Sequence, residues 1–393
     1  MRLAKRMGRL GTETAFDVLV RARALEREGR DIIHLEIGEP DFDSPAAVVA
    51  AGQAALGAGE THYGPAAGLP ELREAIAAWV GSTRGLTVDP GHVVVTPGAK
   101  PVIFYTALAL LEAGDEAILP DPAFPIYESM VRFAGATPVP WRLREERDFR
   151  PDLDELRRLI TPRTRLLVLN SPHNPTGGVL NGADLDAIAD AVRDTEITIL
   201  SDEIYGQLIY EGTHESIATR PGMQARTILL DGFSKTFAMT GWRAGFGVFP
   251  PALVPQIDRL IVNSVSCTPA FTQRACIAAL QDGWPEAAQM RAEFLRRRDA
   301  LVPALNAIPG VHCRRPAGAF YVFPNISDLG VGAEEFADAL LQEFGVAALA
   351  GTAFGAAGAG HLRLSYANSL DNLHRAVNRI AECAASARAA LRV

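Results

Sequence analysis

Short apolar segments, each followed by polar, Gly or Pro residues, alternate with helical patterns along most of this chain. The clearest of these segments are rich in Val, Ile and Leu and cover residues 92–96, 165–170, 197–201 and 227–231. Continuous apolar runs of this length are typical of the central strands of a parallel sheet, because helices cover both faces of such a sheet. The sequence therefore predicts an α/β fold with a mainly parallel sheet.

The pattern changes after residue 285, where a single long helical pattern covers residues 286–308. Two short predicted strands follow it, at 319–323 and 361–366, and a closing helix is expected at 369–392. A chain of 393 residues is long enough for two or three domains.

The beginning of the chain also differs from the sheet region. It contains a predicted helix at 12–28 and a short alternating strand at 33–37, and Ser44 followed by Pro45 is typical of an N-cap and the first residue of a helix. We therefore expect two domains. The large domain would cover residues 46–285, and a smaller α+β domain would combine residues 1–45 and 286–393.

Charge and cysteine content restrict the class of protein. The 46 Asp and Glu outnumber the 38 Lys and Arg, a net charge of −8, whereas nucleic acid or anionic lipid requires a basic face. No apolar run approaches the ~20 residues that cross a bilayer, and the N-terminus lacks the apolar core of a secretory signal. The 4 cysteines are scattered, which fits a reducing compartment and offers no close ligand pairs for zinc. We therefore expect a cytoplasmic protein without nucleic-acid, membrane or metal partners.

The polar residues that directly follow the apolar segments are the candidate site residues, because ligands of open parallel sheets bind beyond the carboxyl ends of the strands. These residues are Ala99, Lys100, Asn174, Asp202, Tyr205, Ser234 and Lys235. Singly, each has an ordinary structural explanation, such as a solvated lysine, a helix-capping Asp, a core Tyr or a turn-forming Asn. Their occurrence together points to one shared site.

Lys235 is the residue of this set with the most specific chemistry. Its sequence neighbours Phe233, Phe237 and Met239 are apolar, and an apolar setting lowers the pKa of a lysine and makes its amine nucleophilic. Arg243 follows eight residues later, where it is placed to hold an anion. A Schiff-base lysine beside an anion-binding Arg indicates pyridoxal phosphate.

The other strand ends supply what this cofactor requires. Asp202 closes a strand too apolar to carry an idle charge, and its carboxylate would keep the ring nitrogen of the cofactor protonated. Tyr205 and Asn174 would donate hydrogen bonds to the phenolic oxygen. The turn TPGAK enters a predicted helix, and the free N–H groups of a helix N-terminus attract phosphate.

Taken as a set, these motifs resemble the class I/II aminotransferases of the fold-type I pyridoxal-phosphate superfamily, and most of all the bacterial branch with the aspartate aminotransferases. The matching stretches extend over nearly the whole chain and read IGEPDF, HYGPAAGLPELREAIA, TPGAK, DPAFPIY, NSPHNPTG, SDEIY, GFSKTFAMTGWRAGF, PAGAFYVF and HLRLSYA. The resemblance implies a large domain with a mostly parallel seven-stranded sheet between helices, and a smaller α+β domain.

The resemblance also implies roles for individual residues. Lys235 would carry the cofactor and move the proton, and Asp202, Tyr205 and Asn174 would contact the cofactor ring as described above. The remaining cofactor contacts would come from the Phe124 ring, the backbone N–H groups of Ala99 and Lys100, Ser234, Arg243, and Tyr63 of the other subunit. Arg363 would bind the substrate α-carboxylate, assisted by Gly38 and Asn174. The implied enzyme is a homodimer with shared active sites.

Three positions depart from the family pattern. Pro101 stands where Gln is common, and the ring-stacking residue is Phe124 instead of Tyr or Trp. His173 replaces an Asn or a small residue next to Asn174. A structural role for His173 is favoured, with contact to cofactor or substrate as the alternative.

Alternative functions remain open at this stage. The favoured one is a ping-pong aminotransferase that acts on an L-amino acid and a 2-oxo acid, with glutamate and 2-oxoglutarate as one pair. A C–S β-lyase or a decarboxylase could use the same scaffold, and a non-catalytic regulatory protein is the remote alternative. The substrate side chain is expected near Phe16, Tyr127, Phe354 and Thr268 of the partner subunit, and no basic residue marks a site for a distal carboxylate.

Overall fold

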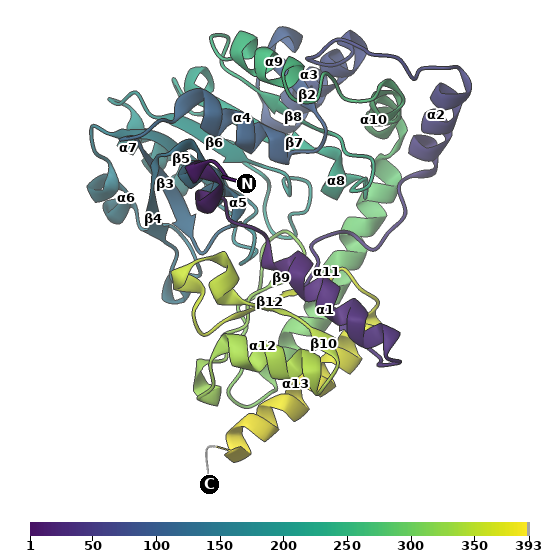
Figure 1. Ribbon diagram of the computed structural model, residues 1–393, viewed down its shortest axis with the longest axis vertical. Coiled ribbons are helices and arrows are strands. Elements are labelled where there is room, and N and C mark those ends of the chain that lie inside the picture. The colour runs from purple at the N-terminus through teal and green to yellow at the C-terminus, as the bar shows by residue number, and fades with distance from the viewer. Residues whose placement is uncertain (391–393) are drawn as a thin grey trace.

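A sheet of seven strands forms the centre of the protein in a computed structural model that describes residues 1–390 (Figure 1). In spatial order the strands are β2 (Val93–Thr96), β8 (Gly245–Val248), β7 (Thr227–Gly232), β6 (Thr198–Asp202), β5 (Thr164–Asn170), β3 (Glu116–Asp121) and β4 (Thr137–Arg142). All neighbours pair in parallel except β8, which is antiparallel to both β2 and β7. The predicted α/β fold with a mainly parallel seven-stranded sheet is confirmed.

Helices lie on both sides of this sheet, and its strands β2, β3, β6 and β7 are almost completely buried. The helices of this region are α2 (Ala46–Gly57), α3 (Pro70–Arg84), α4 (Lys100–Leu110), α5 (Ile126–Ala134), α6 (Leu153–Leu159), α7 (Gly182–Val192), α8 (Phe233–Thr236), α9 (Val254–Val262) and α10 (Ala270–Asp282). This two-sided burial explains why the strands read as continuous apolar runs.

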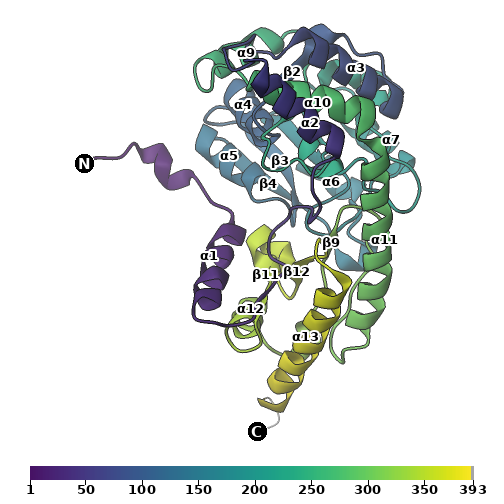
Figure 2. The same cartoon turned by 90° about the vertical axis from the view of Figure 1, so that its right-hand side faces the viewer.

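Both ends of the chain contribute to a second group of elements at the lower end of Figures 1 and 2. Its helices are α1 (Thr14–Arg27), α12 (Ala333–Gln342) and α13 (Leu370–Ala390), and α11 (Trp284–Asn306) connects the two groups. Its short strands are β1 (Ile33–His34), β9 (Tyr321–Val322), β10 (Val346–Ala347), β11 (Leu349–Ala350) and β12 (Leu362–Ser365). We propose that this group is the smaller domain, divided from the larger one at residues 45 and 285.

Some element boundaries differ from the expectation. Ser44 does not cap α2: its hydroxyl donates to the Ala238 carbonyl at 2.9 Å, and Pro45 lies before the helix instead of in its first turn. The predicted strand at 33–37 is reduced to β1, because only two residues pair with β10. The closing helix is described as far as Ala390, and the last residues predicted for it lie outside the described part of the chain.

An aromatic cluster fixes the short helix α8 at the end of β7. Trp79 of α3 packs against Phe233 and Phe237, with ring centroids 6.0 and 6.2 Å apart, and against Phe246 of β8 at 5.5 Å. These rings are buried, so α8 begins and ends on side chains that the core holds in place. Lys235, between the two Phe residues, is thereby held in a defined position at the edge of the sheet.

A buried ion cluster joins α3 to the sheet behind the same edge. Arg84 pairs with Glu203 at 3.1 Å and also with Asp231, and all three side chains are excluded from solvent. His214 and Ser216 bind the Glu203 carboxylate at 2.7 and 2.6 Å. The cluster supplies partners to charges that would be costly to bury alone.

Within residues 1–390 there is no helix with the length and apolar content to cross a membrane.

Candidate active site

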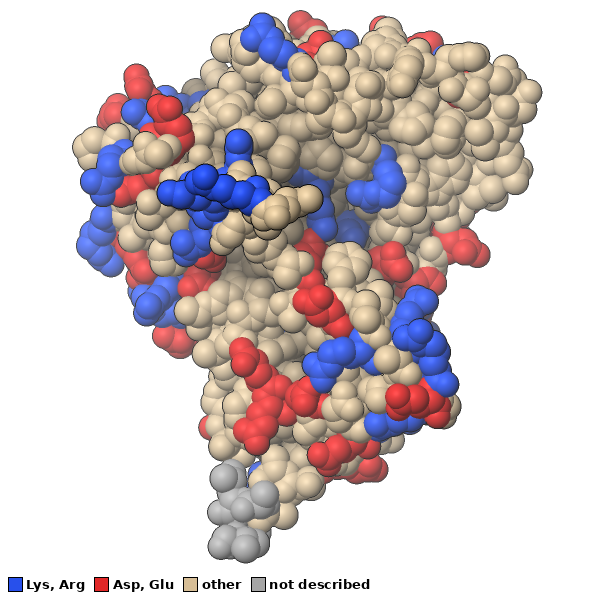
Figure 3. Space-filling model, viewed as in Figure 1, with Lys and Arg blue, Asp and Glu red and all other residues tan. Residues whose placement is uncertain are grey.

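A cavity of about 1060 Å³ opens where the carboxyl ends of the large sheet meet the lower group of elements. Figure 3 shows a hollow in the middle of this face, with basic side chains inside it. Its lining includes most of the predicted site residues: Gly38, Ala99, Lys100, Phe124, Asn174, Asp202, Tyr205, Ser234, Lys235, Arg243 and Arg363. The fold therefore brings together residues that are spread over more than three hundred positions of the sequence.

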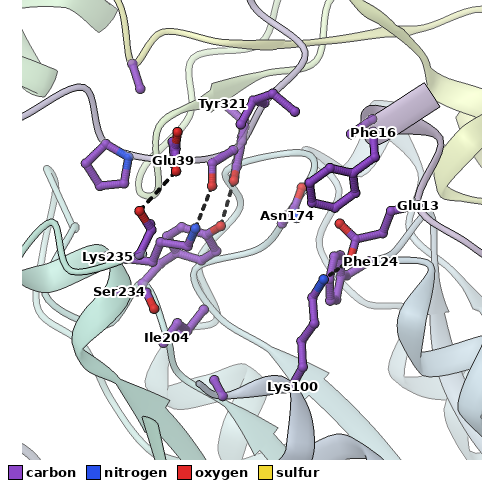
Figure 4. Close-up of a pocket in the computed structure, with 18 of the residues that line it drawn as sticks. Glu13, Phe16, Glu39, Lys100, Phe124, Asn174, Ile204, Ser234, Lys235 and Tyr321 are labelled. Atoms are coloured by element: carbon purple, nitrogen blue, oxygen red, sulfur yellow. Dashed lines mark hydrogen bonds and ion pairs between the residues drawn. The ribbon is translucent and has the colours of Figure 1, made fainter. Parts of the chain in front are cut away.

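Lys235 extends from α8 into this cavity, where its Nζ donates to the carbonyl oxygen of Gly38 at 2.5 Å (Figure 4). Burial lowers the pKa of the amine from 10.5 to about 8, and the nearby carboxylate of Glu39 limits the decrease. A lysine with such a pKa is partly neutral near pH 8 and can act as a nucleophile or a base. The structure thus gives Lys235 the environment that its apolar sequence neighbours predicted.

Asp202 ends β6 and is buried beneath the cavity. Its Oδ2 accepts a hydrogen bond of 2.6 Å from the hydroxyl of Tyr127, and its Oδ1 accepts one of 3.1 Å from the N–H of Ile204. Burial raises the pKa of this carboxyl to about 7, and the two hydrogen bonds oppose the increase. The bond from Tyr127 is a contact that the sequence analysis missed, since it placed Tyr127 only among residues near the substrate side chain.

Tyr205 and Asn174 flank Asp202 on the neighbouring loops. The hydroxyl of Tyr205 bonds to the hydroxyl of Tyr321 at 2.6 Å. The backbone N–H of Asn174 donates to Asn170 Oδ1 at 2.9 Å, while the side-chain oxygen of Asn174 is buried and unpartnered within the described residues. A buried amide oxygen without a partner is costly, so the stability of the fold does not explain the placement of the Asn174 side chain.

The turn before α4 faces Arg243. Ala99 precedes the helix, whose free N–H groups point toward the cavity. Gly98 has a φ of 86°, and a Cβ at this position would lie 2.1 Å from Nη2 of Arg243. Arg243 in turn donates to the Thr240 carbonyl at 2.8 Å. This corner combines the N-terminus of α4, a helix of eleven residues, with the Arg243 guanidinium and the Ser234 hydroxyl. Such a combination suits an anion.

Arg363 projects from β12 on the opposite wall of the cavity. Its guanidinium is buried, lies 4.6 Å from the Tyr321 ring centroid and 5.1 Å from that of Phe354, and donates to the backbone carbonyl of Glu36. Its Nε has no acceptor anywhere in residues 1–390. A buried guanidinium with a free N–H is suited to a carboxylate in a two-pronged pair.

Four predicted residues are not part of the cavity lining of their own subunit. Tyr63 is 89% exposed, Thr268 is buried elsewhere, and Phe354 packs behind Arg363. His173 faces a separate small cavity and bonds through Nδ1 to Thr176 Oγ1 at 2.8 Å, and burial lowers its pKa to about 3. This placement is consistent with the structural role that was favoured for His173.

The Lys100 side chain has a partner that the sequence analysis did not anticipate. Its ammonium pairs with the carboxylate of Glu13, just before α1, at the mouth of the cavity. No local motif identifies Glu13, because the pair joins residues 87 positions apart.

Among residues 1–390 no group of three or more His, Cys, Asp or Glu is arranged to hold a metal ion.

Known proteins resemble this chain in both sequence and structure. The family model "Aminotransferase class I and II" matches residues 30–380. An aspartate aminotransferase of Pyrococcus abyssi is 42% identical over 89% of this chain and 91% of its own length. An arginine–pyruvate transaminase of Pseudomonas aeruginosa is 41% identical over 94% of both chains. The aspartate aminotransferase of Thermus thermophilus, solved with maleate, superposes with a TM-score of 0.93 at 40% identity over 98% of this chain and all of its own. The chain belongs to the class I and II aminotransferases.

Proposed function

We propose that this aminotransferase uses pyridoxal phosphate and moves an amino group between an L-amino acid and a 2-oxo acid by a ping-pong mechanism, with glutamate and 2-oxoglutarate as one pair. The observation that carries the proposal is the position of Lys235, whose partly buried amine reaches into a cavity that Asp202, Asn174 and Arg243 also line. The relatives named above act, by their names, on different amino acids, so family membership alone does not identify the second pair.

The residues of the cavity fit this cofactor. Asn174 offers a side chain that the empty fold leaves unpartnered, next to the end of β6. Asp202 is a buried carboxyl whose raised pKa would return toward its ordinary value beside a cationic ring nitrogen. The Gly98 turn lets the Arg243 guanidinium approach so closely that a Cβ at position 98 would collide with it, and this corner would hold the phosphate. The backbone N–H groups of Ala99 and Lys100 and the Ser234 hydroxyl would complete that corner, and the Phe124 ring would contact the cofactor ring.

Pyridoxal phosphate supplies an aldehyde that bonds to amines and a ring that withdraws electrons from the substrate α-carbon. The protein residues determine which bond at that carbon reacts. Arg363 would bind the substrate carboxylate, and Lys235 lines the same cavity. The Lys235 amine would act as the general base that accepts the proton from the substrate α-carbon and holds it for return. Gly38, whose carbonyl oxygen accepts from Nζ at 2.5 Å, would hold the amine in place.

We further propose a homodimer with shared active sites. Tyr63 is 89% exposed in the single chain, and the family role of its segment is to reach the phosphate of the other subunit. The segment before α1 projects from the body of the protein and carries exposed Leu3, Met7 and Leu10. Apolar side chains on a projecting segment are typical of a surface that a partner covers. A cytoplasmic location also remains part of the proposal.

A single turnover followed by mass spectrometry tests the reaction type. The enzyme is loaded with pyridoxal phosphate, mixed with a panel of L-amino acids and quenched. The expected result is a 2-oxo acid, with the amino nitrogen of the donor transferred to the cofactor. Carbon dioxide would identify a decarboxylase instead, and pyruvate with ammonia and a thiol would identify a β-lyase. Borohydride should trap the cofactor on the peptide that contains Lys235, and trapping on the Lys100 peptide would contradict the assignment.

A further inference from the structure

The ammonium of Lys100 lies at the exposed mouth of the cavity, between a carboxylate and two aromatic rings. It pairs with the carboxylate of Glu13, and it lies 5.7 Å from the ring centroid of Phe16 and 5.5 Å from that of Phe124 (Figure 4). We call Glu13, Phe16 and Phe124 the cation box. A carboxylate and two ring faces all attract positive charge, so these three side chains form a site for a cation that the enzyme's own lysine fills when no substrate is bound.

Glu13 is available for such a ligand. It occupies the N-cap position of α1, but its side chain makes no capping hydrogen bond. The other carboxylates of the cavity wall have other partners: Glu39 the Thr240 hydroxyl, Asp41 Arg297, Glu26 His34 and Asp202 the Tyr127 hydroxyl. Glu13 also contributes to the charge environment of both Lys235 and Arg363. Its carboxylate therefore lies close enough to these two residues to act on them electrostatically.

Lys100 is a replaceable occupant of the cation box. Its side chain is 47% exposed, whereas the Glu13 side chain is only 15% exposed. A lysine has a flexible stem of four carbons and a strongly hydrated head group, and it can therefore turn into solvent without leaving a buried charge behind. Glu13 would be left unpaired by that movement unless another cation replaced Lys100.

We infer that the cation box is the subsite for the distal end of the amino donor, and that it takes a guanidinium or ammonium group that displaces Lys100 from Glu13. The inference rests on the proposed function, because it places the donor carboxylate on Arg363, which lines the same cavity. A distal carboxylate cannot take the place of Lys100, since it would face the Glu13 carboxylate and the negative faces of two rings. The predicted substrate class is therefore an amino acid with a cationic side chain.

L-Arginine and L-citrulline provide a matched pair of donors, since they have nearly the same shape but differ in charge. We expect the loaded enzyme to react with arginine at a kcat/KM about tenfold above that for citrulline, the size of one partly exposed charge pair with cation–π support. Glu13→Gln should bring the ratio close to one. Asp17→Asn, an exposed carboxylate on the same helix that does not line the cavity, is the control and should leave the ratio unchanged.

A binding measurement that involves no reaction gives an independent result. Guanidinovalerate and ureidovalerate keep the carboxylate and the distal group but lack the α-amino group. Titration calorimetry should show that the wild type binds guanidinovalerate about tenfold more tightly than ureidovalerate. Glu13→Gln should bind the two compounds with equal affinity. If the Glu13–Lys100 pair only attaches α1 to α4, Glu13→Gln would lower the rates of all donors by one common factor. This outcome would overturn the inference.

The design also separates the inference from the proposed function. Aspartate, glutamate, alanine and phenylalanine are included in the half-reaction panel. If one of them reacts while arginine is no better than citrulline, the cation box is not a cationic subsite but the aminotransferase proposal stands. If no donor changes the absorbance of the bound cofactor, the proposed function itself fails.

Discussion

Lys235 shows at the scale of a single residue how the cavity changes ordinary acid–base behaviour. Burial lowers the pKa of its amine from 10.5 to about 8, so between these pH values the unfolded chain binds a proton that the folded chain does not. The free energy of unfolding of the cofactor-free enzyme should therefore rise with pH across this window, by roughly 2 kcal/mol relative to Lys235→Met. Urea unfolding of both proteins at pH 7.5 and pH 10 measures the difference, and parallel pH dependences would contradict it.

Tyr127 is expected to adjust the acidity of Asp202. The hydroxyl donates to the Asp202 carboxylate at 2.6 Å and opposes the increase of its pKa, which burial raises to about 7. Tyr127→Phe removes this bond, so the pKa of Asp202 should rise further, by about one unit for a lost hydrogen bond to a charged group. Since Asp202 must be ionised to pair with a protonated ring nitrogen, the acidic limb of the kcat profile should move to higher pH.

Spectroscopic titration of the bound cofactor provides the measurement for this variant, alongside the kcat profile. Tyr105→Phe removes a hydroxyl that bonds to Ser264 away from the cavity, and it serves as the control with an unchanged profile. An acidic limb that stays at the wild-type pH in Tyr127→Phe would show that Tyr127 does not set the acidity of Asp202.

The residues that sequence reasoning located share one property: each follows an apolar strand or belongs to a local motif. Lys235 and Asp202 are of this kind, and the structure brings both to one cavity. The contact of Tyr127 with Asp202 and that of Glu13 with Lys100 escaped because the partners are distant in sequence, at separations of 75 and 87 residues. Such contacts depend on how helices α5 and α1 pack, and no local pattern of residues encodes that packing.

At the scale of elements, one guanidinium links the end of α3 to two buried carboxylates of the sheet region. Arg84 pairs with the buried carboxylates Glu203 and Asp231. Arg84→Met would leave both without their cation and should reduce the free energy of unfolding by about 3–5 kcal/mol. Arg157→Met is the control, because its pair with Asp154 is half-exposed and should contribute less than ~1 kcal/mol. Denaturant unfolding of the two variants decides, and equal losses would refute the special role of the buried cluster.

Element prediction succeeded where burial on two faces leaves a continuous apolar run, as in β5, β6 and β7. It failed for strands whose length is set by their neighbours. Residues 33–37 alternate well, yet only Ile33 and His34 pair with β10. Likewise Ser44 has the chemistry of an N-cap, but its hydroxyl is used by the Ala238 carbonyl and by the indole N–H of Trp242. In both cases tertiary contacts override a correct local preference.

At the scale of the whole molecule, the proposed dimer predicts complementation. Lys235→Ala and Tyr63→Ala should each be nearly inactive alone, since each damages every site of its own homodimer. In a mixed dimer, one site combines an intact Lys235 with an intact Tyr63 of the partner subunit. After subunit exchange in equal amounts, about a quarter of wild-type activity should return. Absence of recovery, once exchange is verified by native mass spectrometry, would contradict shared sites. Lys235→Ala mixed with Lys235→Arg is the control that stays inactive.

The position of α1 has a consequence for how such an enzyme can change over evolutionary time. The helix packs on β10 and β11 and contributes its buried Ala22 to a small cluster with Ile32, Leu341 and Ala347, whereas the sheet strand ends lie on the other side of the cavity. Substitutions at the start of α1 therefore change the cavity lining where we place the donor side chain, while the residues at the strand ends stay the same. The substrate preference of an ancestral enzyme could therefore change through substitutions in its N-terminal residues. Grafting the first turn of α1 between relatives should transfer the substrate preference while conserving turnover.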